Sequence, residues 1–162
     1  MSGIGPVRTR TRDGQSVDDL EARIAVLEAA LPSGEQVLSG LLAGEAIAVG
    51  EPVMLNGSGV FLARATTSDC IVLGVAKTAA SIGVALDIYV GGVVPILFGS
   101  APASATKGTL CYLSSTYGRA TITPPTLSAG VTWATLGVIV GADGADTSPT
   151  VLLRPGDPIY GG

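Results

Sequence analysis

The stretch that decides the fold class is residues 52–62, PVMLNGSGVFL. Two short apolar runs flank Asn56-Gly57-Ser58-Gly59, and Asn and Gly are the residues that a tight turn between antiparallel strands requires. Similar apolar runs, separated by Gly, Pro, Ser and Thr, continue to residue 153 and are typical of strands. The pattern predicts a mainly β fold with strands at residues 46–49, 52–55, 60–64, 71–76, 84–90, 93–98, 109–113, 119–123, 132–139 and 150–153.

The β region contains two halves with one pattern, at about residues 45–98 and 106–156. In each half a hairpin is followed by a third strand that contains Leu-Gly-Val, as Leu73-Gly74-Val75 and as Leu136-Gly137-Val138. A fourth strand lies fourteen residues beyond the middle Gly of each motif. We expect an internal repeat in a compact antiparallel barrel or sandwich over residues 35–162. A chance similarity between Gly-rich strands is the alternative.

A single short helix is expected before the β region, over residues 16–31, with Pro32 and Gly34 as its stop signals. The chain then divides into a flexible basic arm at 1–15, this helix with its stop at 16–34, and the β domain. The apolar residues of the helix follow at spacings of 3, 4, 3 and 4, as the a and d positions of a coiled coil do; they are Val17, Leu20, Ile24, Leu27 and Leu31. An amphipathic helix lying on its own β domain is the alternative, but its apolar stripe is usually broader.

The coiled coil is predicted to form a homotrimer. Arg23 and Glu28 belong to the segment Arg23-Ile24-Ala25-Val26-Leu27-Glu28, which resembles a short signature of trimeric coils, so both are assigned to the trimer interface with the apolar seam. Ile at a with Leu at d favours two strands instead, and a dimer is therefore the alternative. A helix of about 16 residues is only ~24 Å long and marginal by itself, so contacts between β domains must contribute.

The arm carries the one basic cluster of the chain, Arg8, Arg10 and Arg12. The arm is predicted to be either a solvated tail or an anchor that becomes ordered on an acidic protein surface. Because the chain of 162 residues has a net charge of −4, three arginines are too few to indicate a nucleic-acid partner.

Few residues could carry chemistry. The chain has no His, which excludes acid–base catalysis by imidazole and His-ligated metals, and its Ser and Thr residues have no base nearby in sequence. Asp143-Gly144-Ala145-Asp146 is the one close carboxylate pair outside the arm and helix, and it has too few ligands for a dedicated Ca²⁺ site. Cys70 and Cys111 lie in apolar runs and read as buried free thiols, with a disulfide as the alternative. We therefore expect no enzyme activity, no cofactor and no metal.

The β region is apolar and nearly uncharged. Mean hydropathy of the chain is +0.53, and only seven charged residues lie between Ala65 and Leu153. The most apolar stretch, residues 82–98, is broken by Asp87 and Pro95 and cannot span a membrane as a helix, so no membrane partner is expected. Such a surface suits a tightly associated structural subunit better than a free enzyme.

The β region resembles the capsid decoration proteins, also called cement or head-fibre proteins, of tailed bacteriophages. The resemblance covers about residues 40–156 and rests on short apolar motifs, namely Gly50-Glu51-Pro52-Val53, Leu73-Gly74-Val75-Ala76, Lys107-Gly108-Thr109-Leu110, Leu136-Gly137-Val138 and Val151-Leu152-Leu153. It implies a small trimeric β protein without an active site, made in the host cytoplasm. Such a protein binds the major capsid protein on the outside of the virion and stabilises the shell.

The arm and helix distinguish this chain from the compact members of that family, and the resemblance leaves open whether the arm or the β domain faces the shell. A tail-fibre or baseplate segment, which also combines a coil with a trimeric β domain, is the main alternative. A host-receptor-binding module is less favoured, because Trp133 is the single Trp and the four Tyr are scattered.

Overall fold

The computed structural model describes residues 22, 34–102, 107–141 and 147–161. It divides the chain into two compact units, Met1–Ser33 and Gly34–Gly162. The predicted arm and coiled-coil helix lie outside the described residues, apart from Ala22, which is helical and exposed. The fold described below is therefore that of the second unit, the β domain.

The described part of the β domain contains eleven strands, which confirms the mainly β prediction. They are β1 (Gln36–Leu42), β2 (Pro52–Asn56), β3 (Gly59–Leu62), β4 (Val72–Ala76), β5 (Ala85–Pro95), β6 (Leu110–Leu113), β7 (Ala120–Thr121), β8 (Thr132–Trp133), β9 (Thr135–Gly141), β10 (Thr150–Leu153) and β11 (Ile159–Tyr160). Nine form one sheet in the order β3-β2-β4-β5-β10-β9-β6-β7, with β1 also paired to β5, while β8 and β11 form a small second sheet.

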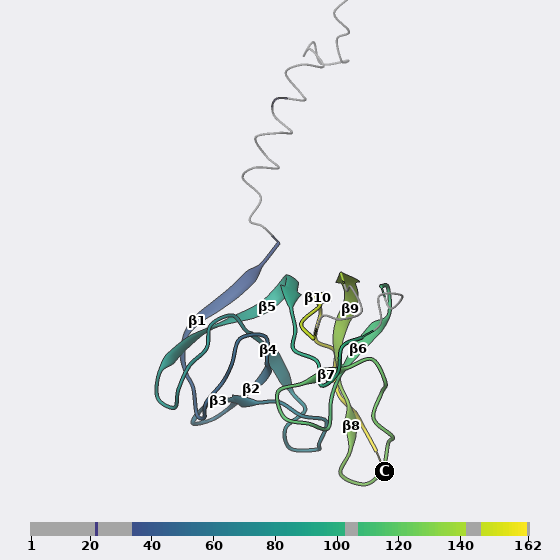
Figure 1. The fold of residues 1–162 in the computed structure, drawn as a ribbon. Coiled ribbons are helices and arrows are strands. Elements are labelled where there is room, and N and C mark those ends of the chain that lie inside the picture. The colour runs from purple at the N-terminus through teal and green to yellow at the C-terminus, as the bar shows by residue number, and fades with distance from the viewer. Residues whose placement is uncertain (1–21, 23–33, 103–106, 142–146, 162) are drawn as a thin grey trace, which may run out of the picture. The chain divides into compact units, whose positions relative to one another are not determined.

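The large sheet is curled but open, a half-barrel, so the expected compact antiparallel barrel or sandwich is confirmed only as a barrel-like sheet (Figure 1). Strands β3 and β7 stand at the two ends of its pairing order. The predicted hairpin at residues 52–62 is confirmed: β2 and β3 pair antiparallel, with Met54 opposite Phe61 and Asn56 opposite Gly59.

Four expected strands differ from the observed ones by more than their end residues. Residues 46–49 do not form a strand, and only Ile47 makes an isolated bridge there, with Ala80. The strands expected at 84–90 and 93–98 are one strand, β5, because Gly92 at φ +100° lets the chain bend without losing its pairing. The stretch 132–139 is divided between β8 and β9 at Ala134, where the chain passes from one sheet to the other.

Strand β1 was not expected, because its side chains do not follow the alternation of a half-buried strand. All of its residues except Leu41 are exposed, and its register against β5 shifts between Leu38 and Leu41. Gly40, at φ +86°, lies inside this shift. A bulge of this kind disrupts the period of two on which strand prediction depends.

The two halves of the sheet share one pairing order. In each half the first hairpin strand pairs with the third strand, and the third pairs with the fourth: β3-β2-β4-β5 is matched by β7-β6-β9-β10. The backbone bonds match as well, since the Gly50 N–H donates to the Ala76 carbonyl at 2.8 Å and the Gly108 N–H donates to the Ile139 carbonyl at 2.7 Å. The isolated parallel bridges Ala43–Val60 and Phe98–Ala120 also correspond.

The middle Gly of each Leu-Gly-Val motif is required by a close approach of backbone. A Cβ on Gly74 would lie 2.1 Å from the carbonyl O of Tyr89, and one on Gly137 would lie 2.0 Å from that of Leu152. Only glycine allows the third and fourth strands to lie this close. In both halves the motif therefore allows the third strand to lie close to the backbone of the fourth.

The buried side chains form two clusters. The smaller lies within the first half and includes Val53, Val60, Leu86 and Ile88. The larger is built from both halves in nearly equal measure, and it contains Met54 and Val75 of the first half together with Leu136 and Ile139 of the second. The two halves are therefore held together by a continuous apolar contact, which the hydrophobic effect stabilises.

Candidate functional site

The least exposed charge of the described residues, Glu51, joins the two halves of the domain. It immediately precedes β2, and its Oε1 lies 2.5 Å from Nη1 of Arg119, which immediately precedes β7. Its Oε2 accepts the Ala48 backbone N–H at 2.8 Å. The Glu51 side chain is 9% exposed, and Gly118 leaves room for it, since a Cβ there would lie 3.1 Å from the carboxylate. Both oxygens are bonded, so this carboxylate serves as a structural clamp.

A second polar cluster surrounds Asp69, in the connection between β3 and β4. Its Oδ2 accepts hydrogen bonds from Arg64 Nε at 2.9 Å and from Thr66 Oγ1 at 3.1 Å. Burial raises the pKa of Asp69, but hydrogen bonds from Ser68, Arg64 and Thr66 outweigh it and hold this pKa below its ordinary value. The Arg64 guanidinium also lies 4.0 Å from the centre of the Tyr117 ring, a favourable cation–π distance.

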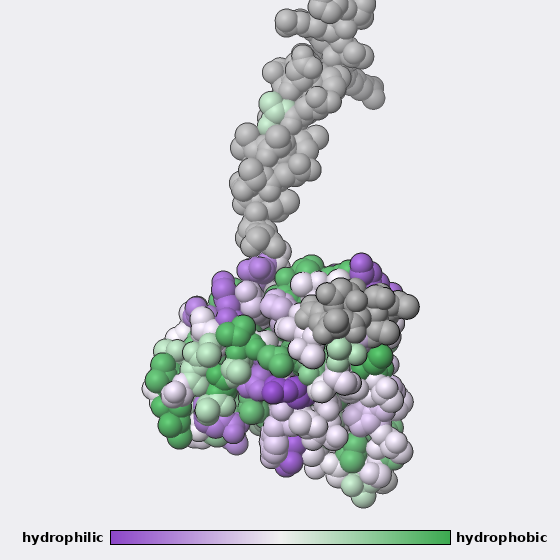
Figure 2. Space-filling view, viewed as in Figure 1, coloured by the Kyte–Doolittle hydropathy of each residue, from purple (hydrophilic) through white to green (hydrophobic). Residues whose placement is uncertain are grey.

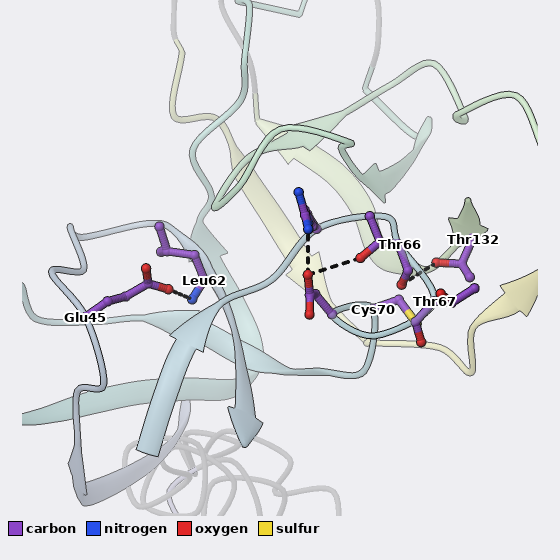
Figure 3. A network of polar contacts seen from close by, with 8 residues as sticks. Glu45, Leu62, Thr66, Thr67, Cys70 and Thr132 are labelled. Carbon is purple, nitrogen blue, oxygen red and sulfur yellow. Dashed lines mark hydrogen bonds and ion pairs between the residues drawn. The ribbon is translucent and has the colours of Figure 1, made fainter. Parts of the chain in front are cut away.

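The same connection is tied to β8 and to its own backbone. Figure 3 shows the Thr132 hydroxyl, which is fully buried, directed at the carbonyl of Thr66, to which it donates at 3.2 Å. The Cys70 thiol contacts the Thr67 carbonyl at 3.9 Å. These bonds hold a loop in place and leave its polar groups satisfied, which is a structural role.

Both cysteines are buried and unpaired, as expected from their apolar surroundings. Burial raises the pKa of the Cys111 thiol to about 12. At neutral pH this thiol is therefore protonated, and a protonated thiol is a poor nucleophile.

A pocket of about 190 Å³ lies between the hairpin and the loop around Asp69; it is lined by Glu45, Met54, Asn56, Phe61, Leu62, Asp69 and Tyr117. One of its two carboxylates, Glu45, accepts the Leu62 backbone N–H at 2.7 Å (Figure 3). The other, Asp69, is bonded to Arg64. The polar groups of this pocket hold the hairpin and loop in place, and they leave no paired acid and base facing it.

Within the described ranges, no three His, Cys, Asp or Glu side chains lie close enough together to hold a metal ion. No helix in the same part of the chain has the length and hydropathy needed to cross a membrane.

Exposed apolar side chains distinguish the surface of the β domain. Fifteen large apolar residues are exposed among those described, and Figure 2 shows apolar and polar residues interspersed over the viewed face. They are Val37, Leu38, Leu42, Val49, Leu55, Ile71, Ile82, Val84, Val93, Leu110, Tyr117, Leu127, Val140, Ile159 and Tyr160. A surface of this composition is suited to contact with protein.

Part of this surface was missed by the sequence prediction. Leu42, Ile82 and Val84 lie together where β1 meets β5, since the Ala43 N–H donates to the Val84 carbonyl at 2.9 Å and the Gly83 N–H donates to the Ala43 carbonyl at 2.7 Å. Their side chains are more than half exposed. The apolar run VLSGLL at residues 37–42 was the available signal.

The predicted site residues lie outside the described part of the chain. This applies to the arm residues Arg8, Arg10 and Arg12, and to the coil residues Val17, Leu20, Arg23, Ile24, Leu27, Glu28 and Leu31. It also applies to Asp143 and Asp146. The trimer interface, the anchoring arm and the acidic turn therefore stay predictions.

Comparison of the chain with models of known protein families, with curated protein sequences and with solved structures found no match.

Proposed function

We propose that this protein is a non-enzymatic virion component, a homotrimeric decoration protein that binds the outside of a phage capsid and stabilises it. The observation that carries the proposal is the surface of the β domain, where large apolar side chains are exposed and the least exposed carboxylate is bonded within the domain. Such a surface favours association with protein over recognition of a small polar substrate. The partner that we propose, the major capsid protein, is the one that the resemblance of residues 40–156 to phage decoration proteins implies.

Trimerisation through the seam from Val17 to Leu31 supports this function energetically. Three identical weak contacts that act together at a symmetric site bind much more tightly than one, because the second and third form at a high effective concentration. The arm residues Arg8, Arg10 and Arg12 provide cations for an acidic patch on the shell.

Trp133 favours a structural role over a receptor-binding tip. Its indole N–H donates to the Pro125 carbonyl, and its ring centre lies 6.2 Å from that of Tyr112. These contacts use both its polar atom and its ring within the domain itself.

Co-sedimentation with empty capsids that lack decoration tests the proposal. The full-length protein should pellet with the shells and saturate them, and Leu27→Asp, which removes the trimer, should bind at least about 100-fold more weakly. Replacement of Arg8, Arg10 and Arg12 by Ala tests the arm as the anchor, with Arg154→Ala, an exposed Arg in the β domain, as the matched control. Failure of the full-length protein to pellet contradicts the proposal, and binding to tails alone favours the fibre or baseplate alternative.

A further inference from the structure

A row of four apolar residues runs across the strands of the second half and the C-terminal part of β5. Val93, Leu152, Val138 and Leu110 are successive cross-strand partners on β5, β10, β9 and β6. Residues directly opposite each other lie on the same face of a sheet. Val93 is 49% exposed and Leu110 is 46% exposed, and the two residues between them are half-buried.

The next residues along these strands show that this row faces away from the core. Val94, Val151 and Ile139 are cross-strand partners on β5, β10 and β9, and all three are fully buried. Since successive side chains of a strand point to opposite faces, the row lies on the outer face. Val93, Leu110, Val138 and Leu152 are called the outer row below.

The corresponding face of the first half is covered by protein. Pro52, Val75 and Tyr89 are cross-strand partners on β2, β4 and β5, and the Leu-Gly-Val motifs align them with the outer-row residues of β6, β9 and β10. Val75 is fully buried in the cluster that contains Ile139 of the second half, and Tyr89 packs against that cluster. The same apolar face is therefore buried in one half and open in the other.

The described β domain begins next to the strand that carries Val93. A Cβ on Gly92, the residue before Val93, would lie 2.2 Å from the carbonyl O of Gly34, so the first residue of the β domain passes next to β5. The 33 residues of the unit Met1–Ser33 precede this point and include the predicted coil. A coil that joins three chains would hold three β domains, each with its outer row, at a high effective concentration of one another.

We propose that the outer rows of three chains pack against one another around the threefold axis of a homotrimer, so that each row is covered by second copies of this chain. The inference rests on the homotrimer of the proposed function and adds the contact between β domains that a short, marginal coil requires. In this arrangement the same residues of each chain meet at the axis, as closed rotational symmetry allows.

Cross-linking of Val93→Cys with a short tris-maleimide tests the contact in the full-length protein. The native cysteines, Cys70 and Cys111, are fully buried and should not react in the folded state. Leu55→Cys is the matched control, because Leu55 is a strand residue on β2 that is 55% exposed and lies outside the outer row. We expect a denaturing-gel band at three chain masses for Val93→Cys and not for Leu55→Cys. Equal cross-linking of the two variants overturns the proposal.

A dilution series followed by sedimentation provides the second measurement. Leu110→Lys should raise the concentration of half-dissociation at least tenfold over that of Leu55→Lys, because it places a charge in an apolar contact. Equal values overturn the outer row as a contact between copies and leave the trimer of the proposed function intact; coverage by the chain's own helix or by capsid protein would give this result. A wild-type chain that is monomeric at every concentration overturns both.

Discussion

Replacement of Gly74 by Ala tests the structural account of the repeat at its tightest point. The added Cβ would lie 2.1 Å from the carbonyl O of Tyr89, 2.8 Å from Ile88 Cγ2 and 3.0 Å from the Tyr89 carbonyl carbon. Two of these three atoms belong to the backbone of β5, which pairs with β4 at this point through Val75 and Tyr89. Relief of the clash therefore requires β4 and β5 to move apart by about 1 Å, which weakens their hydrogen bonds.

The expected loss of stability can be estimated from two effects. Overpacking of a close-packed interior costs about 1–3 kcal/mol, and a buried backbone group left without its partner costs about 1–3 kcal/mol. Gly74→Ala should therefore lower the free energy of unfolding by about 2–6 kcal/mol. For the β domain, Gly34–Gly162, each kcal/mol lowers Tm by roughly 3–5 °C, so the decrease in Tm is between about 6 and 30 °C.

Urea and thermal unfolding, followed by circular dichroism at one fixed protein concentration, measure this loss. Gly57→Ala is the matched control, because its added Cβ would meet no atom within 4 Å and its φ is not in the left-handed region. Gly137→Ala, at the corresponding position of the second half, should cost at least as much as Gly74→Ala, since its Cβ would lie 2.0 Å from the Leu152 carbonyl O and its φ of +154° is one that alanine rarely adopts. Unfolding of Gly74→Ala within about 0.5 kcal/mol of Gly57→Ala would refute the reasoning.

Three further outcomes are expected. Leu27→Asp places a charge in the predicted seam and should reduce the mass in light scattering from three chains to one; an unchanged mass would show that the helix does not join the chains. Asp69→Asn should be less stable than wild type at neutral pH, and the difference should disappear as pH falls below about 4, because the pKa of Asp69 is lowered in the folded state. Cys70 and Cys111 should resist an aromatic disulfide reagent at pH 8 until the protein unfolds, and rapid reaction of the native protein would contradict their burial.

The sequence predicted those features of the fold that depend on neighbouring residues. Asn56-Gly57-Ser58-Gly59 specifies a hairpin by turn chemistry alone, and β2 and β3 form it. The Leu-Gly-Val motifs identified equivalent third strands, β4 and β9. In both strands the glycine is required because the backbone of the neighbouring strand leaves no room for a Cβ. Both predictions succeeded because they depend on residues close together in the sequence.

Features that depend on distant residues were not predictable in this way. Gly91-Gly92 looked like a strand boundary, but pairing with β10 on the far side of Gly92 continues β5 to Pro95. The open form of the sheet depends on how its two ends lie in space, which strand patterns do not specify. Tertiary pairing thus overrode the local signal.

The candidate site was predictable only in part for the same reason. Glu51 and Arg119 are 68 residues apart in the chain, so their ion pair has no local signature. The outer row also depends on register, because its four residues come from four strands that only the sheet brings together. Composition indicated an apolar, sparsely charged surface, but it could not show where on the domain that surface lies.

Imaging of empty capsids incubated with the full-length protein tests the central claim most directly. The account predicts additional density with threefold symmetry on the outer surface of the shell, which is absent when Leu27→Asp replaces the wild-type protein at the same concentration. Bare shells after incubation at saturating wild-type concentration, or density confined to tails, would contradict it.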